Sequence, residues 1–155
     1  KGLDILFNAA YDFLDKKNFI LLIVGDGSLV DTYKKKYSDL PIKFIGNVDN
    51  PLKYLKSADI FFFPSRREGL GNSLIEAQIL GKNIISSDCP SGPKEIINLF
   101  ENGVLFESEN VNELIKTIKH FQIKDNNIVS PETISKFSVT SIGNQYLDFL
   151  LKILE

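Results

Sequence analysis

The sequence predicts an α/β fold in which helices cover both faces of a doubly wound parallel sheet, an α/β/α sandwich. Short apolar runs alternate with amphipathic segments along the whole chain, and such an alternation predicts parallel strands joined by right-handed crossovers. The run Phe19–Val24 contains no polar residue, which is typical of a strand buried on both faces. A chain of 155 residues has room for one domain of this kind and not for two.

The strands and helices follow from hydrophobic periodicity and from capping residues. The predicted strands are Phe19–Val24, Ile42–Ile45, Asp59–Phe63, Ile84–Ser86 and Val104–Phe106. The predicted helices are Leu3–Leu14 with Lys16 and Lys17 at its C-terminal end, Leu29–Tyr37, Leu52–Ser57, Ser73–Leu80, Pro93–Leu99, Val111–Phe121, a short helix from Pro131, and Thr140–Leu154. We expect four of these helices to be N-capped, by Ser28, Asn50, Asn110 and Ser130.

One strand is missing from this inventory. A doubly wound sheet is built around its first strand, whereas this sequence opens on a helical pattern at Leu3. We therefore expect that strand and the loop after it immediately upstream of Lys1. On this interpretation residues 1–155 are a single domain, truncated at its N-terminus, of a larger two-domain protein.

Composition excludes several classes of function. A net charge of −2 gives no field that would hold nucleic acid. A single cysteine, Cys89, and a single histidine, His120, provide too few ligands for a Cys/His metal site or for a disulfide within the chain. The apolar runs are too short to span a bilayer. We expect a cytoplasmic protein without a metal or other cofactor.

The segment after the strand Asp59–Phe63 carries the most specific chemistry. Open parallel sheets bind ligands beyond the carboxyl ends of their strands, and here Gly69 and Gly71 let the backbone pass close to a ligand. A helix begins just after them, and the free N–H groups at its start suit a phosphate or diphosphate. Glu68 on the loop and Glu76 in the helix offer acceptors for sugar hydroxyls. This combination indicates a pocket for a nucleoside diphosphate sugar.

The spacing of Glu68 and Glu76 resembles the E-x7-E signature of the retaining glycosyltransferases of GT-B fold, which are built from two Rossmann-like domains. Further matches lie in order along the chain and cover essentially all of it. They are residues 1–4 (KGLD), 22–27 (LIVGDG), 44–48 (FIGNV), 57–59 (SAD) and 88–95 (DCPSGPKE). The resemblance implies that residues 1–155 are the donor-binding half of such an enzyme.

The resemblance also implies a role for individual residues. Glu68 would accept hydrogen bonds from the donor sugar, Lys1 would neutralise the diphosphate leaving group, and Glu76 would bind the ribose hydroxyls. Backbone amides would contact the sugar and the diphosphate; they are those of Gly71, Asn72, Ser73 and Leu74. Asn47 and Val48 would lie beside the nucleobase. Asn72 departs from the family pattern, since many members carry an apolar residue there.

The activity implied by the resemblance is metal-independent transfer of a hexose or N-acetylhexosamine, with retention of configuration, from a donor such as a UDP-sugar. The acceptor would be a lipid-linked or polysaccharide glycan bound by the other domain, and peripheral membrane association of the full-length protein is an open alternative. The isolated chain would bind donor and have little or no activity. Two other functions stay open, a sugar-nucleotide epimerase of the same fold and a non-catalytic nucleotide-sugar-binding module.

Simpler interpretations exist for the same residues. The run Ser73–Glu76 also matches a capping box, in which serine caps the helix and glutamate bonds back to it. Glu68 next to Arg66 and Arg67 could form a surface ion pair of little energetic value. The turn at Gly25 begins like a dinucleotide-binding fingerprint, but Val30 occupies the position of the third glycine. We therefore expect Gly25 to form a structural turn whose backbone can also touch the donor.

Overall fold

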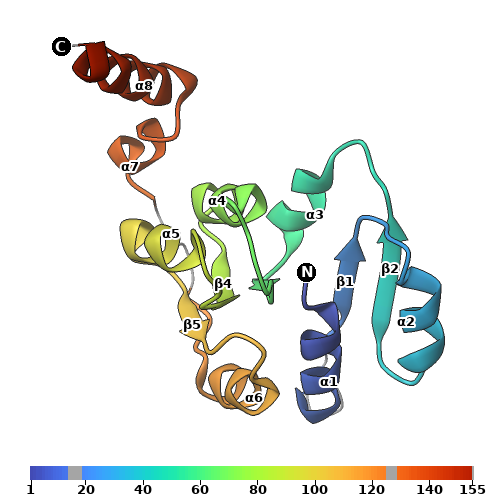
Figure 1. Cartoon of the computed structure of the whole chain (residues 1–155). Helices are drawn as coiled ribbons and strands as arrows, with labels where there is room; N and C mark the ends of the chain where they lie inside the picture. Colours follow the sequence, from blue (N-terminus) through green and yellow to red (C-terminus); the bar gives the residue numbers. More distant parts are fainter. Residues whose placement is uncertain (14–18, 125–128, 155) are drawn as a thin grey trace.

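The computed structural model describes residues 1–13, 19–124 and 129–154, and within them helices and strands alternate as predicted (Figure 1). The end of the first predicted helix, with Leu14, Lys16 and Lys17, lies outside the described residues. The strands are β1 Leu21–Val24, β2 Ile42–Gly46, β3 Ile60–Phe63, β4 Asn83–Ser87 and β5 Val104–Phe106. The helices are α1 Leu3–Phe13, α2 Val30–Lys36, α3 Pro51–Ser57, α4 Asn72–Ile79, α5 Pro93–Phe100, α6 Val111–His120, α7 Pro131–Ser135 and α8 Val139–Leu154.

The paired strands of the described residues all run parallel, as a doubly wound fold requires. β1 pairs with β2 with Leu21 opposite Ile42, and β3 pairs with β4 with Ile60 opposite Asn83. β4 also pairs with β5, so the order in this second sheet is β3-β4-β5. The predicted Rossmann-like α/β class is therefore confirmed.

The single continuous sheet that we predicted is divided in two in the described part of the chain. β1-β2 forms one sheet and β3-β4-β5 the other, and a cavity of about 1040 Å³ extends between them. Every residue of β1 and of β3 lines this cavity. Side chains alternate between the two faces of a strand, so a strand that lines a cavity with consecutive residues presents its edge to it. The two edges therefore flank an open position between the sheets.

Two hydrophobic clusters hold the elements together. The larger cluster surrounds α1, whose Phe7 is fully buried and packs edge-on against Tyr33 of α2. The smaller cluster joins β3, β4, α4 and α5 around Leu74 and Ile84. Between α4 and β5 the Gln78 side chain is fully buried and donates to the carbonyl oxygen of Asn102 at 2.6 Å. This bond satisfies a polar group that would otherwise be costly to bury.

The predicted helix caps have mixed outcomes. Asn110 and Ser130 each accept a hydrogen bond from the amide three residues on. Asn50 occupies the N-cap position of α3 but forms no side-chain cap. The prediction for Ser28 is wrong, because α2 begins one residue later with Leu29 as its N-cap. The Val30 amide donates to the Gly27 carbonyl oxygen, so residues 27–30 form a tight turn before the helix. The helical bonds then begin with the Tyr33 amide, which donates to the Leu29 carbonyl oxygen.

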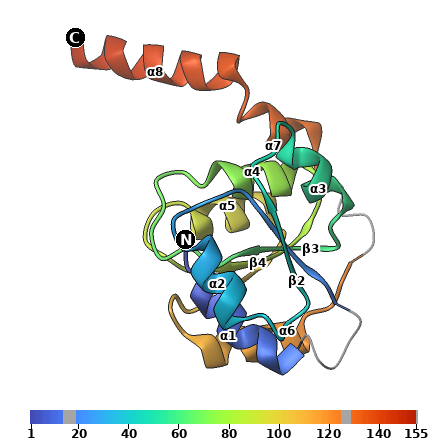
Figure 2. The same cartoon turned by 90° about the vertical axis from the view of Figure 1, so that its right-hand side faces the viewer.

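The C-terminal helix α8 extends away from the body of the molecule, beyond α7 (Figure 2). Several of its large apolar side chains are exposed; they are Val139, Ile142, Tyr146, Leu147, Phe149, Leu151 and Ile153. Among the helices of residues 1–13, 19–124 and 129–154, none combines the length and the apolar character needed to cross a membrane.

Candidate functional site

The candidate site lies where β3 ends, and the N-terminus of α1 lies beside it (Figure 1). Gly2 has a left-handed backbone with φ of +68°, and a Cβ placed on it would overlap the carbonyl oxygen of Pro64. Only glycine allows so close an approach of two backbones. The close approach brings Lys1 next to the loop that carries Glu68. Two segments more than sixty residues apart in the sequence are thus joined at the carboxyl edge of the sheet.

Lys1 and Glu68, the two residues predicted to act in catalysis, are in direct contact. The Lys1 ammonium donates to Oε1 of Glu68, and the Ser65 hydroxyl donates to the same oxygen at 2.7 Å. Partial burial of Glu68 opposes its ionisation, but the hydrogen bonds from Lys1 and Ser65 outweigh it, and the pKa of Glu68 is below its ordinary value. The carboxylate therefore stays charged at neutral pH, and its second oxygen carries neither of these bonds. Glu68 thus pairs with Lys1, and not with a neighbouring arginine as the simpler interpretation of the sequence had it.

The start of α4 provides the predicted anion-binding position. Gly71 is its N-cap with φ of +71°, and the amides of Leu74 and Ile75 both donate to the Gly71 carbonyl oxygen. The amides of Asn72 and Ser73 come before this first intrahelical bond, and amides at that position have no helical acceptor. The Leu74 amide differs from these two in having an acceptor, and its contact with the donor stays a prediction. That amide already has a partner at 2.8 Å, and the Leu74 side chain is buried.

Glu76 is exposed and, with Lys1 and Ser73, lines the cavity described above. The capping-box interpretation of Ser73 and Glu76 is wrong, because the N-cap of α4 is Gly71 and makes no side-chain cap bond. Ser73 is already the second residue of the helix. Glu76 thus has no cap to form, and it lies exposed on the wall of the cavity.

The remaining predicted residues lie at the ends of the neighbouring strands. Gly25 lines the cavity, has φ of +115°, and donates its amide to the carbonyl oxygen of Gly46 at 2.8 Å. Asn47 is exposed and Val48 half-buried, directly after β2. Six of the predicted residues are not among those that line the cavity; they are Asn47, Val48, Glu68, Gly71, Asn72 and Leu74. Glu68 contacts Lys1, which does line it. All predicted site residues therefore lie at the carboxyl edges of β1, β2 and β3.

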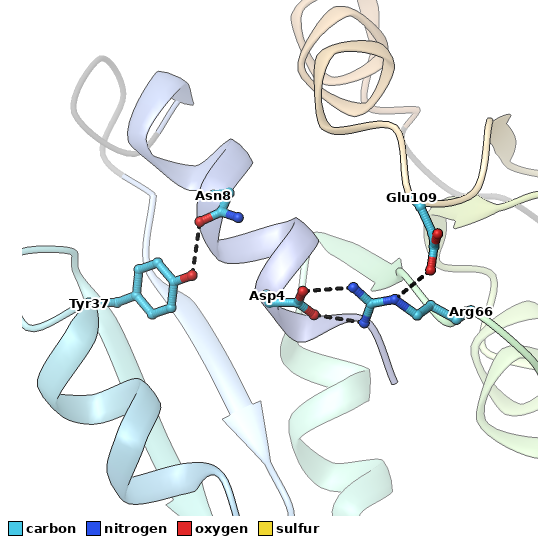
Figure 3. Close-up of polar contacts among 5 residues, drawn as sticks. All are labelled: Asp4, Asn8, Tyr37, Arg66 and Glu109. Carbon is cyan, nitrogen blue, oxygen red and sulfur yellow. Dashed lines mark hydrogen bonds and ion pairs between the residues drawn. The ribbon is translucent and has the colours of Figure 1, made fainter.

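Sequence reasoning missed an ion-pair cluster centred on Arg66. Its two terminal nitrogens donate to the two carboxylate oxygens of Asp4 at 2.8 and 2.7 Å, and its Nε donates to Glu109 at 2.8 Å (Figure 3). Glu109 lies on the loop before α6, so one guanidinium joins three segments. The hydrogen bond from Arg66 is the main cause that lowers the pKa of Asp4 below its ordinary value of 3.8. No local sequence signal pairs residues 4, 66 and 109.

This cluster leads to a pH-dependent stability. A carboxyl group whose pKa is lowered by folding stabilises the fold above its unfolded pKa, and this contribution is lost as the pH falls through the folded pKa. We expect Asp4→Asn to reduce the free energy of unfolding at pH 7 by about 0.5–1 kcal/mol, since both partners are partly exposed. The difference in free energy of unfolding between the variant and the unsubstituted chain should shrink below about pH 4. Urea unfolding of both chains at pH 7 and pH 3 measures it. A difference that is unchanged at pH 3 would contradict the assignment.

Comparison with known proteins agrees with this fold. Residues 1–131 match the family model for glycosyl transferases group 1. A poly(ribitol-phosphate) α-N-acetylglucosaminyltransferase of Staphylococcus aureus is 29% identical over 161 residues, covering 96% of this chain and 32% of its own. An N-acetylgalactosaminyltransferase of Campylobacter jejuni, whose acceptor is an N-acetylgalactosamine-N,N′-diacetylbacillosaminyl-diphospho-undecaprenol, is 31% identical and covers 67% of this chain and 30% of its own.

A solved structure extends the comparison. It is a TarM mutant of S. aureus in complex with fondaparinux, α-GlcNAc-glycerol and UDP, with a TM-score of 0.73 and 26% identity over 94% of this chain and 32% of its own. The chain thus spans about a third of the length of these relatives. Fold and similarity define the class as a Rossmann-like domain of a GT-B glycosyltransferase. The chain belongs to the glycosyl transferases group 1 family.

Proposed function

We propose that this chain binds the nucleoside diphosphate sugar donor of a retaining glycosyltransferase, with UDP as the nucleotide. The observation that supports this most directly is the juxtaposition of three groups at the end of β3. They are the Lys1–Glu68 pair, the first amides of α4, and the Glu76 carboxylate on the cavity wall. A cation and free helix amides suit a diphosphate, and the carboxylates on either side suit hydroxyl groups.

Each residue then has a defined part in donor binding. Lys1 and the amides of Asn72 and Ser73 bind the diphosphate, Glu68 accepts from the sugar hydroxyls, and Glu76 accepts from the ribose. The backbone at Gly25, together with Asn47 and Val48, borders the nucleobase. Two of the relatives are, by name, N-acetylhexosaminyltransferases, and one solved relative contains UDP. These similarities favour a UDP-linked hexose or N-acetylhexosamine as the donor.

In the proposed reaction the acceptor hydroxyl attacks the anomeric carbon while the bond from that carbon to the diphosphate breaks. The new bond forms on the same face of the sugar, and the proton of the acceptor hydroxyl passes to the departing diphosphate oxygen. Negative charge that develops on the leaving diphosphate is met by Lys1 and by the N-terminus of α4, which are in place before the reaction begins. The chemistry assigned to these residues needs no metal ion. The acceptor, a lipid-linked or polysaccharide glycan, is held by a second domain.

Binding of UDP tests the proposed function. We expect Glu76→Ala to weaken UDP binding about tenfold, because one or two hydrogen bonds worth about 0.5–1.5 kcal/mol each are lost from the ribose. Titration calorimetry of the unsubstituted chain and the variant measures this. Glu132→Ala removes an exposed glutamate from the first turn of α7 and should bind UDP as the unsubstituted chain does. If UDP, GDP, ADP and their sugars all fail to bind, the donor-site assignment is wrong.

We also infer that a further β-strand completes the domain between β1 and β3. The two strands are parallel members of sheets on either side of the cavity, and both present their edges to it. Backbone N–H and C=O groups on such edges need partners when they are buried. α1 leads from the carboxyl edge of the sheets to β1, so a strand joined to Lys1 would run parallel to β1 with one helix between them. This is the crossover that parallel sheets use.

A further inference from the structure

We propose that Arg66 is a positioning residue of the donor site, which holds the N-terminus of α1 against the β3 loop and so keeps Lys1 beside Glu68. The inference rests on the proposed function, because it assigns Arg66 a part in placing the diphosphate-binding cation. Arg66 itself does not touch the donor in this scheme. Its effect passes through Asp4 and the first turn of α1.

Two ion pairs connect the same two segments. Asp4 lies three residues after Lys1, and Arg66 lies two residues before Glu68, so the Asp4–Arg66 and Lys1–Glu68 pairs join α1 to the loop side by side. The Lys1 side chain is 73% exposed, and an exposed lysine on a flexible stem gains little from one ion pair. The forked contact of Arg66 with both oxygens of Asp4 fixes distance and orientation together. Arg66 is therefore the stronger of the two constraints on the position of α1.

The third contact of Arg66 fixes the guanidinium itself. Nε donates to Glu109, a non-glycine residue with φ of +67° on the loop before α6 (Figure 3). This loop leads into α6, and α6 packs against α1 through the larger hydrophobic cluster that contains Leu114. Arg66 thus has one carboxylate on each side. Because Glu109 holds the guanidinium in place, the guanidinium restricts the position of the Asp4 carboxylate.

Donor affinity tests the positioning role. We expect Arg66→Ala to weaken UDP binding about tenfold in titration calorimetry, and Arg67→Ala, an exposed neighbour outside the cluster, to leave it unchanged. Asp4→Asn should weaken binding in the same direction. Arg66→Lys should stay impaired, because an ammonium cannot reproduce the forked contact.

A double-mutant cycle separates positioning of Lys1 from a general loss of structure. Lys1→Gln alone should weaken UDP binding about tenfold, and adding Arg66→Ala to it should cost less than a further twofold. A purely structural role for Arg66 gives losses that multiply, and this result would overturn the inference. Equal UDP affinity of Arg66→Ala and the unsubstituted chain would overturn it too, while leaving the proposed function intact.

Hydrogen exchange gives a readout that needs no ligand. The amides of Ile5 and Leu6 donate to the Gly2 carbonyl oxygen in the first turn of α1. We expect Arg66→Ala to speed their exchange at least tenfold relative to amides in α5, and Arg67→Ala to leave it unchanged. Unchanged exchange in Arg66→Ala would show that Arg66 does not hold this turn. Failure of the unsubstituted chain to bind UDP, with the exchange result as expected, would instead contradict the proposed function and leave the contact itself established.

Discussion

Replacing Gly2 by alanine is expected to lower the free energy of unfolding by about 3 kcal/mol. A left-handed backbone costs a residue with a Cβ about 1–2 kcal/mol, and Gly2 has φ of +68°. The added methyl group would also overlap the Pro64 carbonyl oxygen, and relief of such an overlap costs about 1–3 kcal/mol. The melting temperature should fall by roughly 6–12 °C in a chain of this size. Thermal unfolding followed by circular dichroism measures the change.

Gly25→Ala is a matched control for this prediction. Gly25 also has a left-handed backbone, with φ of +115°, but a Cβ placed on it meets no atom within 4 Å. Its substitution should therefore cost only the backbone part, about 1–2 kcal/mol. The difference between the two variants measures the close contact of α1 with the end of β3. Equal losses in both would mean that Gly2 does not lie against Pro64.

The part of the fold that could be predicted from the sequence is the part set by local patterns. The apolar run that ends at Phe63, the glycines after it and the helical pattern from Asn72 place the candidate site with no other information. Strand and helix identities follow in the same way. Apolar side chains must face the core, so apolar residues recur every 2 residues along a half-buried strand and every 3.6 residues along a helix. Glu68 and Glu76 could therefore be assigned to one loop and the helix after it.

The details that could not be predicted depend on contacts between distant segments. Arg66 and Asp4 are 62 residues apart, and nothing in either local sequence favours one partner for Arg66 over another. The start of α4 is decided by the left-handed Gly71, packed against the Phe63 ring, where a capping box beginning at Ser73 was the alternative. The same shift explains why the amide of Leu74 is already bonded within the helix. The partner of Arg66 and the first residue of α4 are therefore set by tertiary packing, which the local sequence does not show.

The largest gain in stability is expected from a strand placed between β1 and β3. We expect a chain extended at its N-terminus by five alternating valine and isoleucine residues and a short polar loop to unfold about 6–12 °C higher. Burial of each such side chain contributes about 1.5–3 kcal/mol and ordering of each backbone residue costs about 1–2 kcal/mol, so the net gain is about 3 kcal/mol. The two strands that it would join consist of apolar residues; they are Leu21–Val24 and Ile60–Phe63.

The position of the added strand can be read from hydrogen exchange. Amides and carbonyls on the facing edges of β1 and β3 gain partners only if the strand enters between them, so exchange should slow at least tenfold in both strands. A control extension with proline at its centre lacks one donor and cannot continue the ladder, and it should protect neither strand. Protection of β5 without protection of β1 and β3 would mean that the extension adds to the outer edge of the larger sheet. In that case the cavity would be open space of the donor site along its full length.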